Sequence, residues 1–185
     1  MKTFSLNVAG LERQLSLFPV GGGTYIAAFL MMGDVELTVC CARELLKLCP
    51  DYDCIVTPET KSIPLAMEMA RQNGDAFFVV ARKQIKLYMR NTLSSELKSI
   101  TTENQQCLYL DGKDAELIKN RRVLIVDDVI STGNSLAAVE SLVKAAGSVI
   151  AGRAAVLAEG DAALRKDIIF LDRLPLFAED EAKTD

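Results

Sequence analysis

The sequence contains no histidine and no tryptophan. The absence of histidine excludes Ser-His-Asp and Cys-His catalytic sites, histidine metal ligands and a histidine general base. Any proton transfer or metal binding must therefore use Asp, Glu, Lys, Tyr, Cys or the backbone.

Cysteine pairs and long apolar runs are also missing. The five cysteines are odd in number, form no Cys-x-x-Cys motif and stand mostly in apolar surroundings, so we expect buried free thiols in a reducing cytosol. No apolar run approaches about 18 residues, and Met1–Asn7 lacks the apolar stretch of a signal peptide. We therefore expect a cytoplasmic protein without a membrane partner.

What is present indicates one folded domain over residues 1–185. Half of the residues are apolar and a quarter are charged, which is enough apolar surface for a sizeable core. The formal net charge of −4 gives no general attraction to nucleic acid, and no segment resembles a DNA recognition helix, so we expect no nucleic-acid partner.

The pattern along the chain predicts an α/β fold. In residues 4–20, apolar and polar residues alternate in part around Gly10, which predicts strand-like structure and is compatible with a hairpin. Apolar residues at helical spacing follow, up to Pro50. Apolar strands then alternate with helices, which is typical of a mostly parallel sheet with both faces covered. We predict strands at 54–57, 77–81, 123–126, 154–157 and 168–171, and helices at 64–72 and 135–146. Ligands in such sheets bind beyond the carboxyl ends of the strands.

One segment, residues 83–106, is polar, weakly periodic and too long for an ordinary connection. It predicts a mobile lid or a flap of extra strands, and a solvated insertion is the alternative.

The strongest motif runs from Val123 to Ser135. A buried strand delivers Asp127 and Asp128 to its end, and a turn of small hydroxylic residues then leads into a helix. Backbone N–H groups and the helix dipole form an anion cradle there, while two carboxylates accept hydrogen bonds from a diol. Together these groups predict a site for a sugar 5-phosphate. A simple capped helix would explain the hydroxyls but not two adjacent acids. The cradle residues are Ser131, Thr132, Gly133, Asn134 and Ser135.

This motif closely resembles the phosphoribosyl-pyrophosphate (PRPP) motif of type I phosphoribosyltransferases, the purine branch above all. The resemblance implies that Asp127 and Asp128 contact the ribose hydroxyls and that residues 131–135 hold the 5-phosphate. The segment after the first alternating strand resembles the family's pyrophosphate loop, although an ordinary strand-to-helix turn would also suit it. That segment contributes Glu59, Thr60, Lys61 and Ser62.

A basic cluster follows the next strand. Arg82, Lys83 and Lys86 suit a pyrophosphate leaving group, and we assign catalytic roles to the two lysines beside the two acids. A solvated basic turn is the alternative.

The resemblance further implies a small hood of residues 1–32, a core of residues 33–178 and an acidic tail of residues 179–185. It makes residues 86–103 the catalytic lid. It also implies a homodimer, and Mg²⁺ that arrives with PRPP and has no direct protein ligand.

The base is less constrained by sequence. Hypoxanthine-guanine transferases carry an Asp at the position of Ser131, whereas adenine and xanthine transferases carry a small residue, so we expect adenine first and xanthine second. Ile26, Ala27 and Glu159 are candidates for the base pocket, with plain core and turn as the alternative. Other functions that remain open are a non-catalytic PRPP sensor of the purine-repressor type and an orotate phosphoribosyltransferase-like enzyme.

Overall fold

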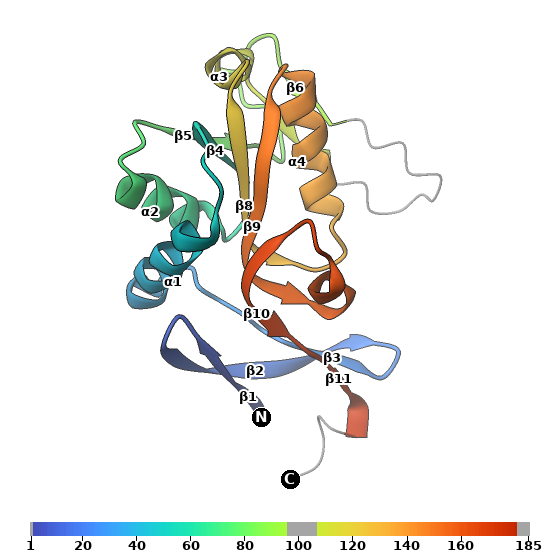
Figure 1. The fold of residues 1–185 in the computed structure, drawn as a ribbon. Coiled ribbons are helices and arrows are strands. Elements are labelled where there is room, and N and C mark those ends of the chain that lie inside the picture. The colour runs from blue at the N-terminus through green and yellow to red at the C-terminus, as the bar shows by residue number, and fades with distance from the viewer. Residues whose placement is uncertain (1, 96–106, 181–185) are drawn as a thin grey trace.

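The computed structural model describes residues 2–95 and 107–180 and is built around a five-stranded sheet (Figure 1). All neighbouring strands are parallel, and β8 is buried at every position from Val123 to Asp128. This confirms the predicted α/β fold. In spatial order the strands are β10 (Ile169–Leu174), β9 (Val149–Glu159), β8 (Arg122–Ile130), β4 (Cys54–Pro58) and β5 (Phe78–Ala81).

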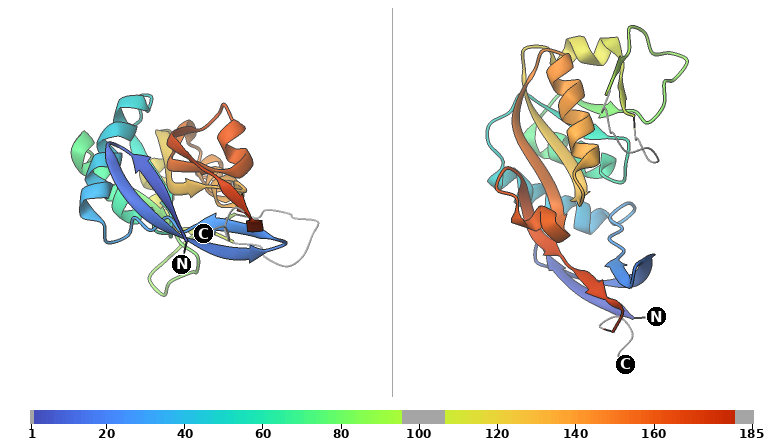
Figure 2. Two further views of the ribbon diagram at one scale, coloured as in Figure 1. Left: turned by 90° about the horizontal axis from the view of Figure 1, so that it is seen from below. Right: turned by 90° about the vertical axis from the view of Figure 1, so that its right-hand side faces the viewer.

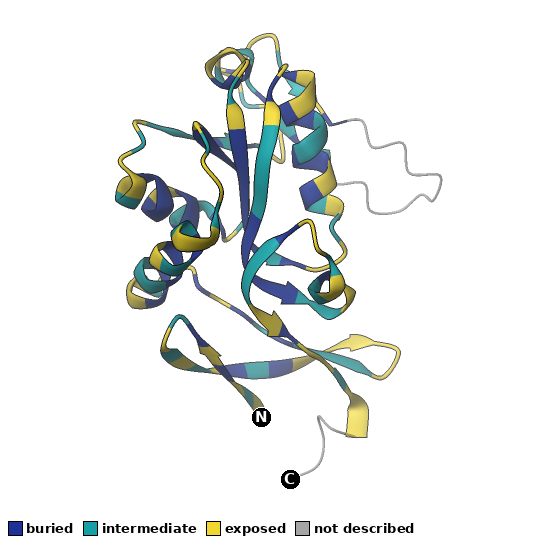
Figure 3. Ribbon diagram, in the orientation of Figure 1, coloured by how far each residue is buried: buried dark blue, intermediate teal, exposed yellow. Residues whose placement is uncertain are grey.

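Helices cover both faces of this sheet. Helices α1 (Val35–Leu48) and α2 (Ile63–Asn73) lie on one face, and α4 (Asn134–Ala145) lies on the other (Figure 1). The short helix α3 (Gly112–Ile118) lies near one end of α4. Each face therefore has its own apolar core, and buried residues line the sheet between the helices (Figure 3).

Local sequence signals explain where the first helices begin and end. The side chain of Asp34 caps α1 by accepting the Leu37 N–H at 3.0 Å, and α1 ends just before Pro50. Pro64 stands in the first turn of α2, and Gly74 closes that helix with a φ of +78°, a conformation that side chains other than glycine's rarely adopt.

A second, antiparallel sheet, the hood sheet, lies beyond the carboxyl ends of the parallel strands (Figure 1). The predicted hairpin is confirmed as its first two strands. A short C-terminal strand, which the sequence did not indicate, joins the third, so both ends of the described chain lie at the hood sheet (Figure 2). Its strands are, in order, β1 (Thr3–Val8), β2 (Leu11–Gly21), β3 (Thr24–Ala27) and β11 (Leu176–Ala178).

The hood sheet shares its core with the main sheet. Leu6, Leu17 and Phe29 of the N-terminal segment belong to the same buried cluster as Leu37 of α1 and Leu174 of β10. The expected boundary at residue 32 thus separates segments that are packed together through one core.

The polar segment after β5 is partly described. Its residues 93–94 form β6 (Leu93–Ser94), which pairs with β7 (Tyr109–Leu110) in a small antiparallel ladder. Leu87 and Tyr88 stand exposed in the turn before β6. Residues 96–106 lie outside the described residues, and the part of the predicted lid from 96 to 103 falls there.

Other differences from the sequence prediction concern element length. β8 and β9 run several residues beyond their apolar runs, and α3, β3, β7, β11 and the 3₁₀ helix η1 (Gly160–Leu164) were not predicted. β6 lies in the segment 83–106, for which a flap of extra strands was one of the two predictions. Within the described residues, no helix is long and apolar enough to cross a membrane.

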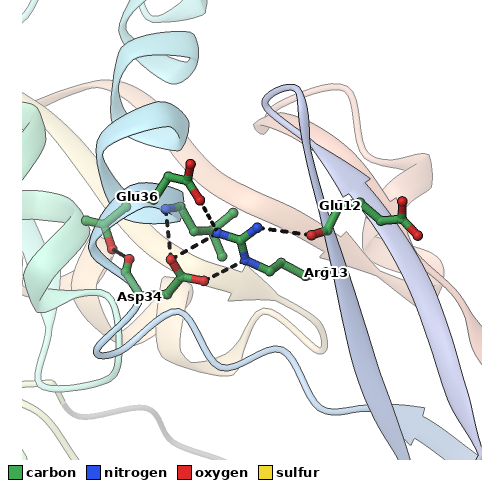
Figure 4. A network of polar contacts seen from close by, with 6 residues as sticks. Glu12, Arg13, Asp34 and Glu36 are labelled. Carbon is green, nitrogen blue, oxygen red and sulfur yellow. Dashed lines mark hydrogen bonds and ion pairs between the residues drawn. The ribbon is translucent and has the colours of Figure 1, made fainter.

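An ion-pair network joins the hood sheet to α1 (Figure 4). Arg13 of β2 contacts both carboxylate oxygens of Asp34, at 2.7 and 3.2 Å, and its Nη2 reaches Glu36 at 2.8 Å. Its Nη1 donates to the backbone carbonyl of Glu12 at 3.0 Å. The Arg13 guanidinium holds the pKa of Asp34 below its usual value, and the Leu37 N–H adds to this effect. Asp34 therefore both caps a helix and anchors the hood sheet.

We predict that Arg13→Gln lowers the melting temperature at pH 7 by a few degrees. The pKa of Asp34 is depressed in the folded state, so this contribution is present above the unfolded pKa near 4 and is lost as pH falls through the folded pKa. Melting curves between pH 3 and 8 test this. The control is Arg43→Gln, which removes an exposed arginine of α1. A gap between variant and wild type that does not narrow as pH falls from 8 to 3 would contradict the role of the ion pair.

Candidate functional site

The candidate site lies at the carboxyl edge of the parallel sheet, facing the hood sheet (Figure 1). Because all five strands run the same way, the segments that follow β4, β5, β8 and β9 emerge at this one edge. The structure thus brings together the segments that carry the predicted phosphate, ribose and pyrophosphate residues.

Asp127 and Asp128 lie inside β8 rather than beyond its end, because the strand continues to Ile130. Both are buried, with 6% and 7% of their surface exposed. The Oδ1 atom of Asp127 accepts the Asp128 N–H at 3.0 Å and the Thr60 hydroxyl at 3.1 Å.

A chain of hydroxyl groups leads to Asp127 from the loop after β4. The Thr60 and Ser62 oxygens are 2.6 Å apart, and the Ser62 and Thr57 oxygens are 2.7 Å apart. Each hydroxyl has a single proton. Since Thr60 donates to Asp127, Ser62 must donate to Thr60 and Thr57 to Ser62. The chain is therefore polarised toward the carboxylate, and it fixes the loop against β8.

The environment of Asp127 disfavours its charge. Burial raises its pKa to about 7, and the neighbouring Asp128 charge adds to the rise, while the Asp128 N–H and the Thr60 hydroxyl act against it. The fold therefore holds a carboxyl group that titrates near neutral pH beside a second acid. Perturbed groups of this kind cluster at functional sites.

The turn after β8 contains the residues of the predicted cradle. Gly133 has a φ of +82° and immediately precedes α4, and the Asn134 N–H points to the Thr132 hydroxyl at 3.5 Å. A small open pocket of about 100 Å³ is lined by Asp127 and by residues 129–136. The first N–H groups of a helix have no intrahelical partner, so an anion gains hydrogen bonds as well as the helix dipole here.

The loops after β4 and β5 meet through Glu59. Its carboxylate accepts the Lys83 N–H at 2.9 Å, pairs with Arg82 at 3.1 Å and lies 3.9 Å from the Lys86 ammonium. The Lys83 N–H lowers the pKa of Glu59 most, followed by the two cationic side chains. Lys61 is exposed on the adjoining loop. Two side chains of the predicted basic cluster, Arg82 and Lys86, thus lie at one carboxylate, and Lys83 contacts it through its backbone N–H.

The base-pocket candidates lie where the hood sheet approaches the main sheet. Glu159 ends β9, and a Cβ added to the next residue, Gly160, would lie 3.1 Å from Leu176 of β11. Leu176 is paired with Ile26 on β3. Ile26 and Gly160, the residue after Glu159, therefore both lie beside Leu176. Ala27 is 2% exposed and packs into the hood core.

Comparisons with known proteins agree with this geometry. Residues 42–179 match the family model described as a phosphoribosyl transferase domain. A hypoxanthine/guanine phosphoribosyltransferase of Methanococcus voltae is 29% identical over 150 residues, which are 81% of this chain and 73% of the relative. An adenine phosphoribosyltransferase of Petrotoga mobilis is 36% identical over 107 residues, 55% of this chain and little more than half, 56%, of the relative.

A solved structure shows the same fold. Adenine phosphoribosyltransferase from Thermoanaerobacter pseudethanolicus aligns with a TM-score of 0.69 at 24% identity, over 86% of this chain and 95% of that one.

The chain belongs to the phosphoribosyl transferase domain family. Phosphoribosyltransferases are pentosyltransferases, enzymes that move a five-carbon sugar group. The family match covers all the segments of the carboxyl edge, from the loop after β4 to the turn before β11.

Two features of this phosphoribosyltransferase site were missed in the sequence. One is the hydroxyl chain, since Thr60 and Asp127 are 67 residues apart and only the β4–β8 pairing brings them together. The other is Arg165, whose Nη1 would lie 2.9 Å from a Cβ placed on Gly133. Arg165 stands in a charged turn after η1 that carries no sequence signal of its own.

We predict that Asp127→Asn stabilises the protein above pH 7. Wild-type Asp127 has a folded pKa above its unfolded value, so the unfolded state loses its proton first and the free energy of unfolding falls as pH rises from about 4 to about 7. Asparagine keeps an oxygen that can accept both hydrogen bonds but carries no charge. Melting temperatures should coincide near pH 4 and differ by several degrees at pH 8.

The control is Asp51→Asn, which removes one acid from an exposed position. An Asp127→Asn variant that is less stable than wild type at pH 8 would show that the carboxylate serves the fold instead.

Proposed function

We propose that the protein is a purine phosphoribosyltransferase, which joins PRPP and a base to give a nucleoside 5′-monophosphate and pyrophosphate, with adenine favoured and xanthine second. One observation carries the proposal. Along the sheet order β8-β4-β5, the cradle, the two acids, the Glu59 loop and the basic cluster succeed one another. PRPP presents its 5-phosphate, ribose diol and diphosphate in that same order.

In this proposal the chain mainly positions and neutralises its substrate. Asp127 and Asp128 accept hydrogen bonds from the ribose 2- and 3-hydroxyls, and their negative charge favours the oxocarbenium-like state at C1. Their burial strengthens these interactions. Residues 131–135 hold the 5-phosphate, far from the bond that breaks, and so supply binding energy that fixes C1 in place.

In the proposal, the loops after β4 and β5 bind the diphosphate leaving group. The backbone of residues 59–62 and the side chains of Lys61, Arg82, Lys83 and Lys86 neutralise the charge that develops on it. In the free protein Glu59 occupies Arg82 and Lys86. A diphosphate would compete with this carboxylate for both cations.

Magnesium enters this proposal as part of the substrate. Mg²⁺ prefers phosphate oxygens and water, and when bound it neutralises the diphosphate. The described residues contain no group of three or more acidic or cysteine side chains placed to hold a metal ion. The acids at the edge, Asp127, Asp128 and Glu59, fit contacts through ribose hydroxyls or water.

The preference for adenine is supported by Ser131 and Glu159. Ser131 stands where hypoxanthine-guanine transferases carry an Asp that serves the purine ring. Glu159, half-buried at the end of β9, is an acceptor. It suits the 6-amino group of adenine and disfavours a 6-carbonyl oxygen. Relatives named for adenine and for hypoxanthine/guanine both occur, so the base needs a direct test.

The proposal also includes one domain over residues 1–185, a homodimer and a cytoplasmic location. Light scattering of the purified chain tests the oligomeric state.

The experiment that tests the function is a panel of adenine, xanthine, hypoxanthine, guanine and orotate with PRPP and Mg²⁺, scored by pyrophosphate release. We expect turnover with adenine. The double variant Asp127→Asn/Asp128→Asn should fold and lose more than about tenfold in kcat/KM, because each lost charge-assisted hydrogen bond is worth about 1.5–3 kcal/mol. PRPP binding without turnover on any base would identify a sensor. Turnover confined to orotate would contradict the purine assignment.

The base preference predicts the effect of Glu159→Lys. A donor then replaces the acceptor, so the ratio of kcat/KM for adenine to that for hypoxanthine should fall by about tenfold or more. Asp161→Lys, the same charge change on exposed η1, is the matched control. An unchanged ratio in Glu159→Lys would remove Glu159 from the base site.

A further inference from the structure

The turn that holds the proposed 5-phosphate carries no cation of its own, yet one side chain reaches it from elsewhere. A Cβ built on Gly133 would lie 2.9 Å from Nη1 of Arg165, whose guanidinium therefore rests against the turn. η1, which directly precedes Arg165, lies beside the end of α4 at which the cradle sits (Figure 1). The two positions are 32 residues apart in the sequence, and all of α4 and β9 lie between them.

The guanidinium is held in a fixed orientation. Its Nε and Nη2 form a two-point ion pair with the Asp167 carboxylate, at 2.9 and 2.7 Å. This geometry uses one edge of the guanidinium and turns Nη1 toward Gly133.

Asp167 is in turn tied to α4. Arg153 of β9 lies 3.9 Å from Asp167 and donates to Glu140, which is on α4 and 17% exposed. The path Arg165, Asp167, Arg153, Glu140 thus runs from the cradle back to the helix that starts at it. Such a closed path limits the conformational freedom that Arg165 would lose on binding an anion.

We infer that Arg165 is a further binding residue for the 5-phosphate, with Asp167 as its positioning residue. The inference rests on the proposed function. Two constraints then favour glycine at position 133. Its φ is positive, and a side chain there would displace the Arg165 guanidinium. A phosphate dianion bound to the turn would gain a charge-assisted hydrogen bond from Nη1 in addition to backbone N–H groups.

The test compares two ligands that occupy different ends of the site. Calorimetry should show that Arg165→Gln weakens ribose 5-phosphate binding by about tenfold or more, the loss typical of one charge-assisted hydrogen bond, and leaves pyrophosphate binding unchanged. Arg165→Lys should retain part of the affinity. Lys166→Gln, which removes the exposed neighbouring cation, is the matched control and should bind both ligands as wild type does. In turnover, Arg165→Gln should raise KM for PRPP with little change in kcat.

Three results would overturn the inference. If Arg165→Gln binds ribose 5-phosphate within about twofold of wild type, Arg165 does not contact the phosphate and the proposed function still stands. If the variant loses both ligands alike, its role is in the fold. If wild-type protein binds neither ligand, the proposed function itself fails and the inference fails with it.

Discussion

The site depends on keeping two carboxyl groups inside an apolar sheet. Asp127 and Asp128 sit in β8 between β4 and β9, directly after the buried apolar run Val123–Val126. Burial opposes their charge, and they oppose each other. Hydrogen bonds from the Thr60 hydroxyl and the Asp128 N–H offset only part of the cost of a buried charge on Asp127. A diol that donates to both carboxylates would complete their hydrogen bonding, so part of the free energy that folding loses there is recovered on binding.

The hood sheet is the second element that the site requires, and it is attached at two places. The Arg13–Asp34 pair joins β2 to the start of α1, and β11 carries the chain from β10 directly into the hood sheet. Because Leu176 of β11 packs on Gly160, the position of the hood sheet also determines the shape of the region between Ile26 and Glu159. β2, which carries Arg13, is connected to that region through its pairing with β3 and the pairing of β3 with β11.

Sequence reasoning located the elements whose signals are local. Apolar runs in β4 and β8, the end of α1 before Pro50 and the Asp-Asp-turn-helix motif each fit within a few residues, and all are present. It could not find β11, a three-residue strand whose stability comes from β3 rather than from its own sequence. It also could not find the contact between Thr60 and Asp127 or that between Arg165 and Gly133, since both depend on which strands lie side by side. Local propensity predicts elements, whereas contacts between loops follow from topology.

Three cationic side chains at the carboxyl edge form ion pairs with carboxylates in the free protein. Arg82 and Lys86 face Glu59, and Arg165 faces Asp167, so each of these cations already has a carboxylate partner. Such partners keep the cations oriented and reduce the cost of ordering them, but they also compete with an anionic ligand. The two pairs differ in how they leave room for it. Asp167 takes only one edge of Arg165 and leaves Nη1 toward Gly133, whereas Glu59 contacts both Arg82 and Lys86. In the proposed reaction, this difference would suit the Arg165 end to a phosphate that stays bound and the Glu59 end to a diphosphate that leaves.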